Sequence, residues 1–270
     1  MSTALSISVS STIDSETILQ KALLLAKKID LPFFRTISDS STEYVLAYTD
    51  RGLKLLHISS NSSKTDSILY VDFVRGENGY RLANNCTVKQ PLARAAGIKS
   101  GTRPTVLDAT AGFGTDAFVL ASLGCNLTMI ERSPIVAALL ADGLARAHNH
   151  KNTRTITGKR MELLWGNSIE ILSSTKKTYQ TIYLDPMYPH RKKSALTKQE
   201  MRFLRQCVGD DNDGDLLLRT ALKRAENRVV VKRPKGAEPL ADIPPSHTIT
   251  MKNNRFDIYL TFNLNLQNLD

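Results

Sequence analysis

Cysteine is scarce in this sequence. The 270 residues contain three, Cys86, Cys125 and Cys207, which lie far apart and form no CxxC motif and no Cys/His pair at metal-ligand spacing. An odd number of scattered cysteines argues against a disulfide framework and against a structural zinc site. The aspartate-rich run at 210–213 lacks the glycine and the terminal glutamate of a calcium loop, so we predict no metal site.

Long hydrophobic runs are also missing. The apolar run between Lys21 and Lys28 is far shorter than the roughly 20 residues that a membrane helix needs. Residues 1–11 are rich in serine and threonine and lack the basic region and hydrophobic core of a signal peptide. The sequence therefore predicts a cytoplasmic protein that does not contact a membrane.

Acidic residues are outnumbered, and the basic excess is concentrated in one part of the chain. There are 36 lysines and arginines against 26 acidic residues, which gives a formal net charge of +10. The segment from Lys151 to Arg205 alone holds 12 basic and 4 acidic residues. Clustered positive charge is typical of proteins that bind a phosphate backbone, but charge alone does not distinguish such a protein from one with a solvated basic surface.

The first 85 residues predict a small α+β N-terminal domain. A helix is expected from Ser15 to Ile29, where apolar residues recur at helical spacing after a capping signal. A hairpin turn is expected at 50–52. The expected strands around it are Tyr44–Tyr48, Leu53–Ile58 and Ile68–Val74.

Residues 86–270 predict a larger α/β domain, because strands and helices alternate from Thr105 onward. The expected strands are Thr105–Asp108, Cys125–Glu131, Met161–Trp165, Thr181–Leu184 and Arg228–Val231. The expected helices are Thr115–Leu123, Pro134–Ala147, Ser168–Leu172, Thr197–Gln206 and Asp215–Ala225. Such alternation favours a parallel sheet covered by helices. The last two strands, Thr248–Met251 and Phe256–Phe262, are expected to form an antiparallel hairpin at the sheet edge.

A glycine-containing turn follows the first of these five strands. Asp108 ends the strand, and Gly112 and Gly114 lie in the turn that opens the next helix. Glycine lets the backbone approach a ligand closely, and Glu131 ends the second strand, where an acidic residue can bind ribose hydroxyls. Gly112, Gly114 and Ala117 formally fit a dinucleotide fingerprint, but Asp108 would face a pyrophosphate unfavourably. S-adenosylmethionine carries a sulfonium and an ammonium group and no phosphate, so it suits these acidic residues better.

The third and fourth strands also end in polar residues at this edge. Asn167 and Ser168 follow the third strand, where they would either hydrogen-bond an adenine edge or cap the next helix. The fourth strand ends in Asp185-Pro186-Met187-Tyr188, which combines a carboxylate, a rigid turn and an aromatic face. A common Pro-rich turn is the alternative. The order and spacing of these segments favour an amino methyltransferase over a dehydrogenase.

Four stretches of the sequence carry a specific resemblance to a known family. They are DATAGFGTD (108–116), DAFVLASLGCNLTMIERSPIVAALLADGL (116–144), YLDPMYPHRKKSALTKQE (183–200) and VVVKRP (229–234). From residue 72 onward, the chain resembles the bacterial small-subunit ribosomal RNA guanine-N2 methyltransferase J family. The resemblance implies a Rossmann-like class I fold. It also implies S-adenosylmethionine-dependent methylation of the exocyclic amine of a guanosine near the 3′ end of 16S rRNA, either naked or in the 30S subunit.

The resemblance also implies a set of cofactor contacts. These contacts fall on Thr115, Asp116, Glu131, Arg132, Asn167, Ser168 and Asp185, which together with Asp108, Gly112 and Gly114 form the predicted cofactor site. Two positions depart from the family pattern, since Thr115 stands where relatives have arginine and Asn167 where they have serine. Asp185 and Met187 likewise replace the asparagine and second proline of the Asn-Pro-Pro-Tyr form.

The expected chemistry centres on the segment that begins at Asp185. The exocyclic nitrogen of guanine is a poor nucleophile because its lone pair is delocalised into the ring. Asp185 and the Pro186 carbonyl would accept its N–H groups, while Tyr188 stacks on the splayed-out base. Basic residues near this edge would bind RNA phosphates: His190, Arg191, Lys192, Lys193, Lys198, Arg202, Lys232 and Arg233.

Two functions from other classes stay open at this point. A DNA amino methyltransferase would share the Asp-Pro-x-Tyr segment, and assays on both nucleic acids would separate the two. A non-catalytic RNA-binding protein would need the basic cluster but neither the glycine turn nor Asp185, and it would not bind S-adenosylmethionine. The sequence does not determine the oligomeric state.

Overall fold

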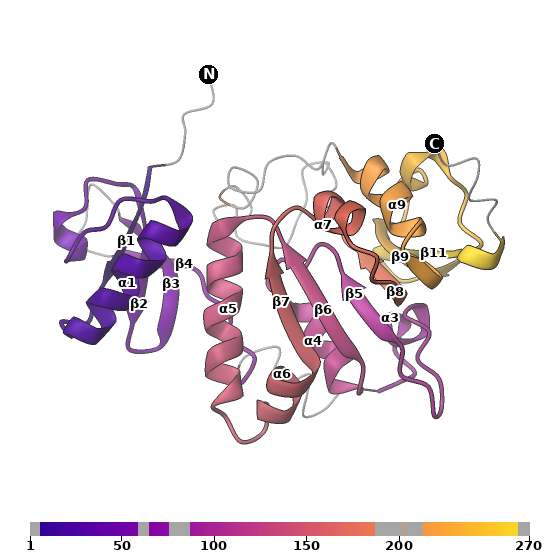
Figure 1. The fold of residues 1–270 in the computed structure, drawn as a ribbon, viewed down its shortest axis with the longest axis horizontal. Helices are drawn as coiled ribbons and strands as arrows, with labels where there is room; N and C mark the ends of the chain where they lie inside the picture. Colours follow the sequence, from indigo (N-terminus) through magenta and orange to yellow (C-terminus); the bar gives the residue numbers. More distant parts are fainter. Residues whose placement is uncertain (1–5, 59–64, 76–86, 187–202, 204–212, 264–270) are drawn as a thin grey trace.

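The fold contains two β-sheets, as a computed structural model shows (Figure 1). The structure describes residues 6–58, 65–75, 87–186, 203 and 213–263. The smaller sheet has four strands in the order β1-β2-β3-β4, and the larger has seven in the order β10-β11-β9-β8-β5-β6-β7. Helix α5 (Pro134–His148) lies where the two sheets meet (Figure 1).

The sequence predicts the strands of the smaller sheet correctly except in two cases. Its elements are β1 (Ile7–Ser11), α1 (Glu16–Ile29), η1 (Ile37–Asp39), β2 (Tyr44–Thr49), β3 (Gly52–Ile58) and β4 (Thr65–Leu69). The prediction of a strand over Ile68–Val74 is wrong beyond Leu69, because the Asp72 carboxylate accepts hydrogen bonds from the backbone N–H groups of Val74 and Arg75 and turns the chain. Strand β1 was not predicted, because its serines are not typical of a buried strand. In the structure all five of its residues are buried, and β1 pairs in parallel with β2.

The larger sheet confirms the predicted α/β alternation. Its parallel strands are β5 (Thr105–Asp108), β6 (Asn126–Glu131), β7 (Met161–Trp165), β8 (Tyr179–Leu184) and β9 (Ala225–Pro234). Strand β11 (Asn254–Leu260) pairs antiparallel with β9, and β10 (His247–Thr250) pairs antiparallel with β11. The predicted terminal hairpin is therefore confirmed, and it forms the edge of the sheet.

Helices cover both faces of the larger sheet. They are α3 (Pro91–Ala95), α4 (Thr115–Ser122), α5, α6 (Arg154–Arg160), α7 (Ser168–Ser174) and α9 (Gly214–Leu222), with short turns η2 (Leu240–Asp242) and η3 (Thr261–Asn263). The short helices α3 and α6 were not predicted. The helix expected over 197–206 lies outside the described residues, apart from residue 203. Side chains alternate across the strands, so that α4 and α5 bury one face and α7 and α9 bury the other.

One hydrophobic core joins the two sheets. It runs without a break from Val9 in β1 through Leu55 in β3 to Leu139 in α5 and Val106 in β5. Polar contacts reinforce this junction, since the backbone N–H of Leu53 donates to Asp142 of α5 at 3.0 Å. The division predicted at residue 85 falls in a segment outside the described residues and stays a prediction.

The strand order creates a crevice at one edge of the larger sheet. From β5 the chain runs outward through β6 to β7, and it then returns to place β8 on the opposite side of β5. Ligands of doubly wound folds bind where the order reverses, at the carboxyl ends of the strands. Across the described parts of the chain, no helix is both long and apolar enough to cross a membrane.

Candidate active site

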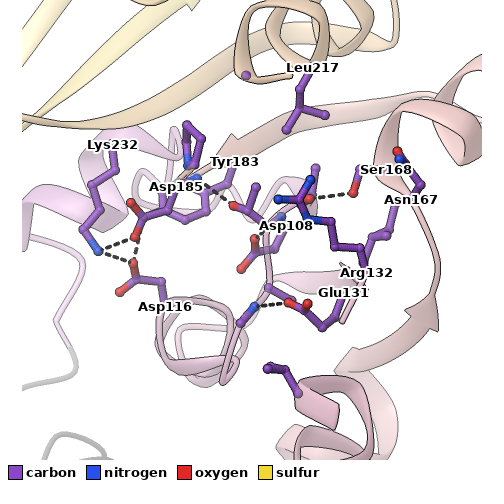
Figure 2. A pocket seen from close by; sticks show the side chains of 18 of the residues that line it. Asp108, Asp116, Glu131, Arg132, Asn167, Ser168, Tyr183, Asp185, Leu217 and Lys232 are labelled. Carbon is purple, nitrogen blue, oxygen red and sulfur yellow. Dashed lines mark hydrogen bonds and ion pairs between the residues drawn. The ribbon is translucent and has the colours of Figure 1, made fainter. Parts of the chain in front are cut away.

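A cavity of about 450 Å³ opens at the carboxyl ends of β5, β6 and β8 (Figure 2). Every residue predicted to bind the cofactor lines it except Gly114. These residues come from four separate strand ends and their following turns, so the fold brings together what the sequence disperses. Their individual contacts with a cofactor stay a prediction.

The glycine turn forms one wall of the cavity. Gly112 has a φ of 53° and Gly114 a φ of 70°, both in the left-handed region that favours glycine. A Cβ on Gly112 would find its nearest neighbouring atom, the Thr110 carbonyl oxygen, at 4.0 Å. A Cβ on Gly114 would instead lie 2.9 Å from a methyl carbon of Leu140 and 3.3 Å from Phe73. Gly112 therefore leaves space on the cavity side, whereas Gly114 lets the turn pack against the core.

Glu131 braces the glycine turn from the end of β6. Its side chain is buried, and one carboxylate oxygen accepts the backbone N–H of Gly112 at 2.8 Å. The other oxygen accepts the backbone N–H of Ser133 at 2.7 Å. The next residue, Arg132, reaches across the cavity to the carboxylate of Asp213 at 3.1 Å. Sequence reasoning considered Asp213 only within the aspartate-rich run at 210–213 and did not assign it to this site, which it joins only through the fold.

The residues after β7 have structural roles as well as a place in the cavity wall. The side-chain oxygen of Asn167 accepts the backbone N–H of Ile169 at 2.8 Å, so Asn167 caps helix α7. The hydroxyl of Ser168 donates to the carbonyl oxygen of Ala109 at 2.6 Å. The capping interpretation is thus confirmed for Asn167, while Ser168 ties β7 to the turn after β5.

Asp185 lies in a network of charged groups at the end of β8. Its carboxylate accepts a hydrogen bond from the Lys232 ammonium at 2.8 Å, and its backbone N–H donates to the hydroxyl of Thr110 at 2.6 Å (Figure 2). The same ammonium donates to Asp116 at 3.0 Å. Tyr183 donates its phenolic hydroxyl to Asp116 at 2.6 Å. Neither Thr110 nor Tyr183 was predicted, although both belong to the strands and turns that were.

Asp108 is a buried acid at the bottom of this network. Burial raises its pKa to about 8, and the nearby carboxylates of Asp116, Asp185 and Glu131 act in the same direction. A hydrogen bond from the backbone N–H of Thr110 opposes the shift. A buried acid among other carboxylates favours a ligand that brings positive charge and disfavours one that brings phosphate.

The predicted RNA contacts divide into two groups. Tyr188, His190, Arg191, Lys192, Lys193, Lys198 and Arg202 lie outside the described residues. Lys232 lines the cavity in its ion pairs with Asp116 and Asp185. Arg233 is 6% exposed and donates to the carbonyl oxygen of Glu238, so its side chain faces the interior and is unsuited to the predicted phosphate contact.

Known proteins match the chain along almost its whole length. A family model described as "Putative SAM-dependent methyltransferase" matches residues 12–261. A protein named Ribosomal RNA small subunit methyltransferase J, from Desulfotalea psychrophila, is 52% identical over 249 residues that cover 92% of this chain and 94% of that protein. The chain belongs to the methyltransferase J family. A relative of the same name from Coxiella burnetii is 45% identical over 244 residues, which cover 90% of this chain and 92% of its own.

A solved structure extends the comparison to the fold. The SAM-dependent methyltransferase from Neisseria gonorrhoeae is 29% identical and superposes with a TM-score of 0.69. The match covers 96% of this chain and 98% of the Neisseria chain. Membership of the methyltransferase J family confirms the Rossmann-like class I fold and S-adenosylmethionine as the cofactor, and the dehydrogenase alternative is set aside. The open space at Gly112 and the acidic wall of the cavity fit this cationic cofactor.

Asp108 gives a prediction for the pH dependence of stability. Its folded pKa of about 8 lies above the ordinary value of 3.8 for an aspartate, so between these pH values the folded protein holds a proton that the unfolded chain has lost. Stability should therefore fall as pH rises through this window, by up to about 1.4 kcal/mol per pH unit. Urea unfolding at pH 5.5 and 7.5 would measure this fall.

The Asp108→Asn variant is the matched control, because an amide has the same shape and does not titrate. We expect its free energy of unfolding to change less across this pH range than that of the wild-type protein. Equal pH slopes for the two proteins would contradict the assignment of a raised pKa to Asp108.

Proposed function

We propose that the protein methylates the exocyclic N2 amine of a guanosine near the 3′ end of 16S rRNA. The observation that carries this proposal is the position of Asp185 at the end of β8, where its carboxylate lines the cofactor cavity with 39% of the side chain exposed. Relatives that share about half of the sequence are named for methylation of small-subunit ribosomal RNA. An RNA guanosine is therefore favoured over a DNA base.

Asp185 is suited to position an exocyclic amine. The backbone at this residue is fixed by the Thr110 hydroxyl, and Pro186 restricts the chain that follows. The Asp185 carboxylate and the Pro186 carbonyl would each accept one N–H of the amine, which aims the nitrogen lone pair into the cavity. When bound, S-adenosylmethionine supplies an electrophilic methyl group. Asp185 would also take up the proton that the amine loses.

The cavity wall is suited to the cofactor in three ways. Gly112 leaves its side of the turn open, Glu131 and Ser133 fix the end of β6, and Asp116 supplies negative charge. These groups would bind and orient the cofactor, while the residues on α9 and Pro186 close the opposite side against water.

The RNA contacts are proposed from the sequence. The basic residues between His190 and Arg202 follow Asp185 directly, so they would hold phosphates on either side of the target nucleotide. We propose that the substrate is 16S rRNA in the cytoplasm, either naked or in the 30S subunit, and that Tyr188 stacks on the extruded base.

Mass mapping of modified nucleotides in 16S rRNA is the direct test. Cells that lack the gene should lose one N2-methylguanosine near the 3′ end, and a plasmid copy of the wild-type gene should restore it. Purified protein should then methylate naked rRNA or 30S subunits from the deletion strain, but not DNA of matched sequence. A complete set of methylated guanosines in the deletion strain would refute the proposal.

A further inference from the structure

We infer that Lys232 is a positioning residue that links the cofactor side of the site to the substrate side. The inference rests on the proposed role of Asp185 and assigns to Lys232 a role different from the phosphate contact that its sequence context predicts. It concerns the interior of the cavity, where Lys232 lies.

The position of Lys232 follows from the sheet register. Lys232 lies on β9, beside β8, and two residues before it Val230 pairs with Tyr183. Its ammonium reaches two carboxylates on different elements, Asp185 after β8 at 2.8 Å and Asp116 in the first turn of α4 at 3.0 Å. One nitrogen thus joins the segment that would hold the target amine to the helix that opens after the glycine turn.

Burial makes this link stronger than a surface ion pair. The side chains of Lys232 and Asp116 are about one quarter exposed, at 26% and 24%. Without the ammonium, the two carboxylates would face each other in a partly buried cavity that also contains Asp108 and Glu131. Like charges at this range repel, so Asp185 would turn toward solvent or take up a proton. Either response removes the acceptor from the position that the amine requires.

Lys232 is poorly suited to the other roles that a lysine takes in such a site. Burial alone would lower the pKa of its ammonium, but the carboxylates of Asp185 and Asp116 outweigh this effect and raise it. Lys232 therefore stays protonated at neutral pH and cannot act as the base that receives the amine proton. Two of its three N–H donors are already committed to carboxylates, which leaves little capacity for a phosphate.

Steady-state kinetics on deletion-strain rRNA or 30S subunits test the inference. Lys232→Met keeps most of the length of the side chain and removes the charge. We expect kcat to fall roughly 30-fold while KM for RNA changes less than about threefold, because the loss affects orientation rather than binding. Lys232→Arg keeps the charge and should recover most of the activity. The acidic limb of the kcat–pH profile should move to higher pH in Lys232→Met.

Two further variants separate positioning from other causes. Lys235→Met removes an exposed lysine just beyond the end of β9 and should leave kcat and KM unchanged. The double variant Asp185→Ala/Lys232→Met should be no slower than Asp185→Ala alone, because Lys232 acts through Asp185. If Lys232→Met fails to fold, Lys232→Gln and the double variant take its place.

The outcomes distinguish this inference from the proposed function. An increase in KM at unchanged kcat, with a weaker salt dependence of RNA binding, would make Lys232 a phosphate ligand and overturn the inference. Wild-type kcat and KM in Lys232→Met would overturn it as well. Both results leave the proposed function standing, since that function falls only if the wild-type protein fails to methylate the guanosine.

Discussion

Replacing Asp185 with alanine should lower kcat about 10³-fold, a typical loss for a group that orients and deprotonates a reacting amine. The reason lies in the geometry, since the Asp185 carboxylate lines the cavity at the end of β8, and Thr110 and Lys232 fix this residue from two sides. Methyl transfer from labelled S-adenosylmethionine to deletion-strain rRNA would measure this change. Calorimetry would show how much of the loss comes from weaker cofactor binding.

Asparagine at position 185 gives a graded comparison. Its side-chain oxygen can still accept from an amine, so Asp185→Asn should be slowed less than Asp185→Ala, by about tenfold. The loss that remains would reflect the missing charge toward Lys232 and the missing proton acceptor. Glu226→Ala, which removes an exposed carboxylate at the start of β9, should keep full activity. Near-wild-type turnover of Asp185→Ala would refute the role proposed for Asp185.

Replacing Gly112 with alanine should weaken S-adenosylmethionine binding about 100-fold, because one added methyl group would occupy cofactor space in a closely packed site. In the protein alone this methyl group meets no atom closer than 4.0 Å, so the clash should arise only with a ligand present. Isothermal titration calorimetry would measure the affinity, and urea unfolding would measure the stability.

Gly101 provides a matched control for this experiment. It also has a left-handed φ, 74°, and a Cβ built on it has no neighbour within 4 Å, but it lies in a loop away from the cavity. Both alanine variants should lose about 1–2 kcal/mol of stability through backbone strain. Only Gly112→Ala should lose cofactor affinity. Equal affinities in the two variants would show that the open side of Gly112 is not cofactor space.

Much of the larger sheet could be predicted because its signals are local. The carboxyl ends of parallel strands share one edge, so Asp108, Glu131, Asn167 and Asp185 could be assigned to a common site from their position after four strands. The acidic residues at this edge already favoured S-adenosylmethionine as the cofactor, and the resemblance to the methyltransferase J family implied the RNA substrate. Strand β1 was missed because its serines resemble a polar tail, and they are buried only in the folded protein, where β1 pairs with β2.

The polar network of the site could not be predicted in the same way. Which atom Lys232 contacts depends on the register between β8 and β9 and on the direction in which each side chain points. Its sequence neighbours are basic, so a local interpretation placed it with the RNA contacts. Asp213 joined the cavity through an ion pair with Arg132, 81 residues away. Such pairings are consequences of the tertiary structure.

The continuous core has a thermodynamic consequence for the smaller sheet. In the described part of the chain, no residue of β1 to β4 lines the cavity, yet Phe73, which follows β4, packs beside Phe118 of α4 and under Gly114. Elements that share a core tend to unfold cooperatively. A ligand that binds only the folded state therefore raises the free energy of unfolding of every part of that cooperative unit. The first strands of the chain would gain resistance to unfolding from a cofactor that they never touch.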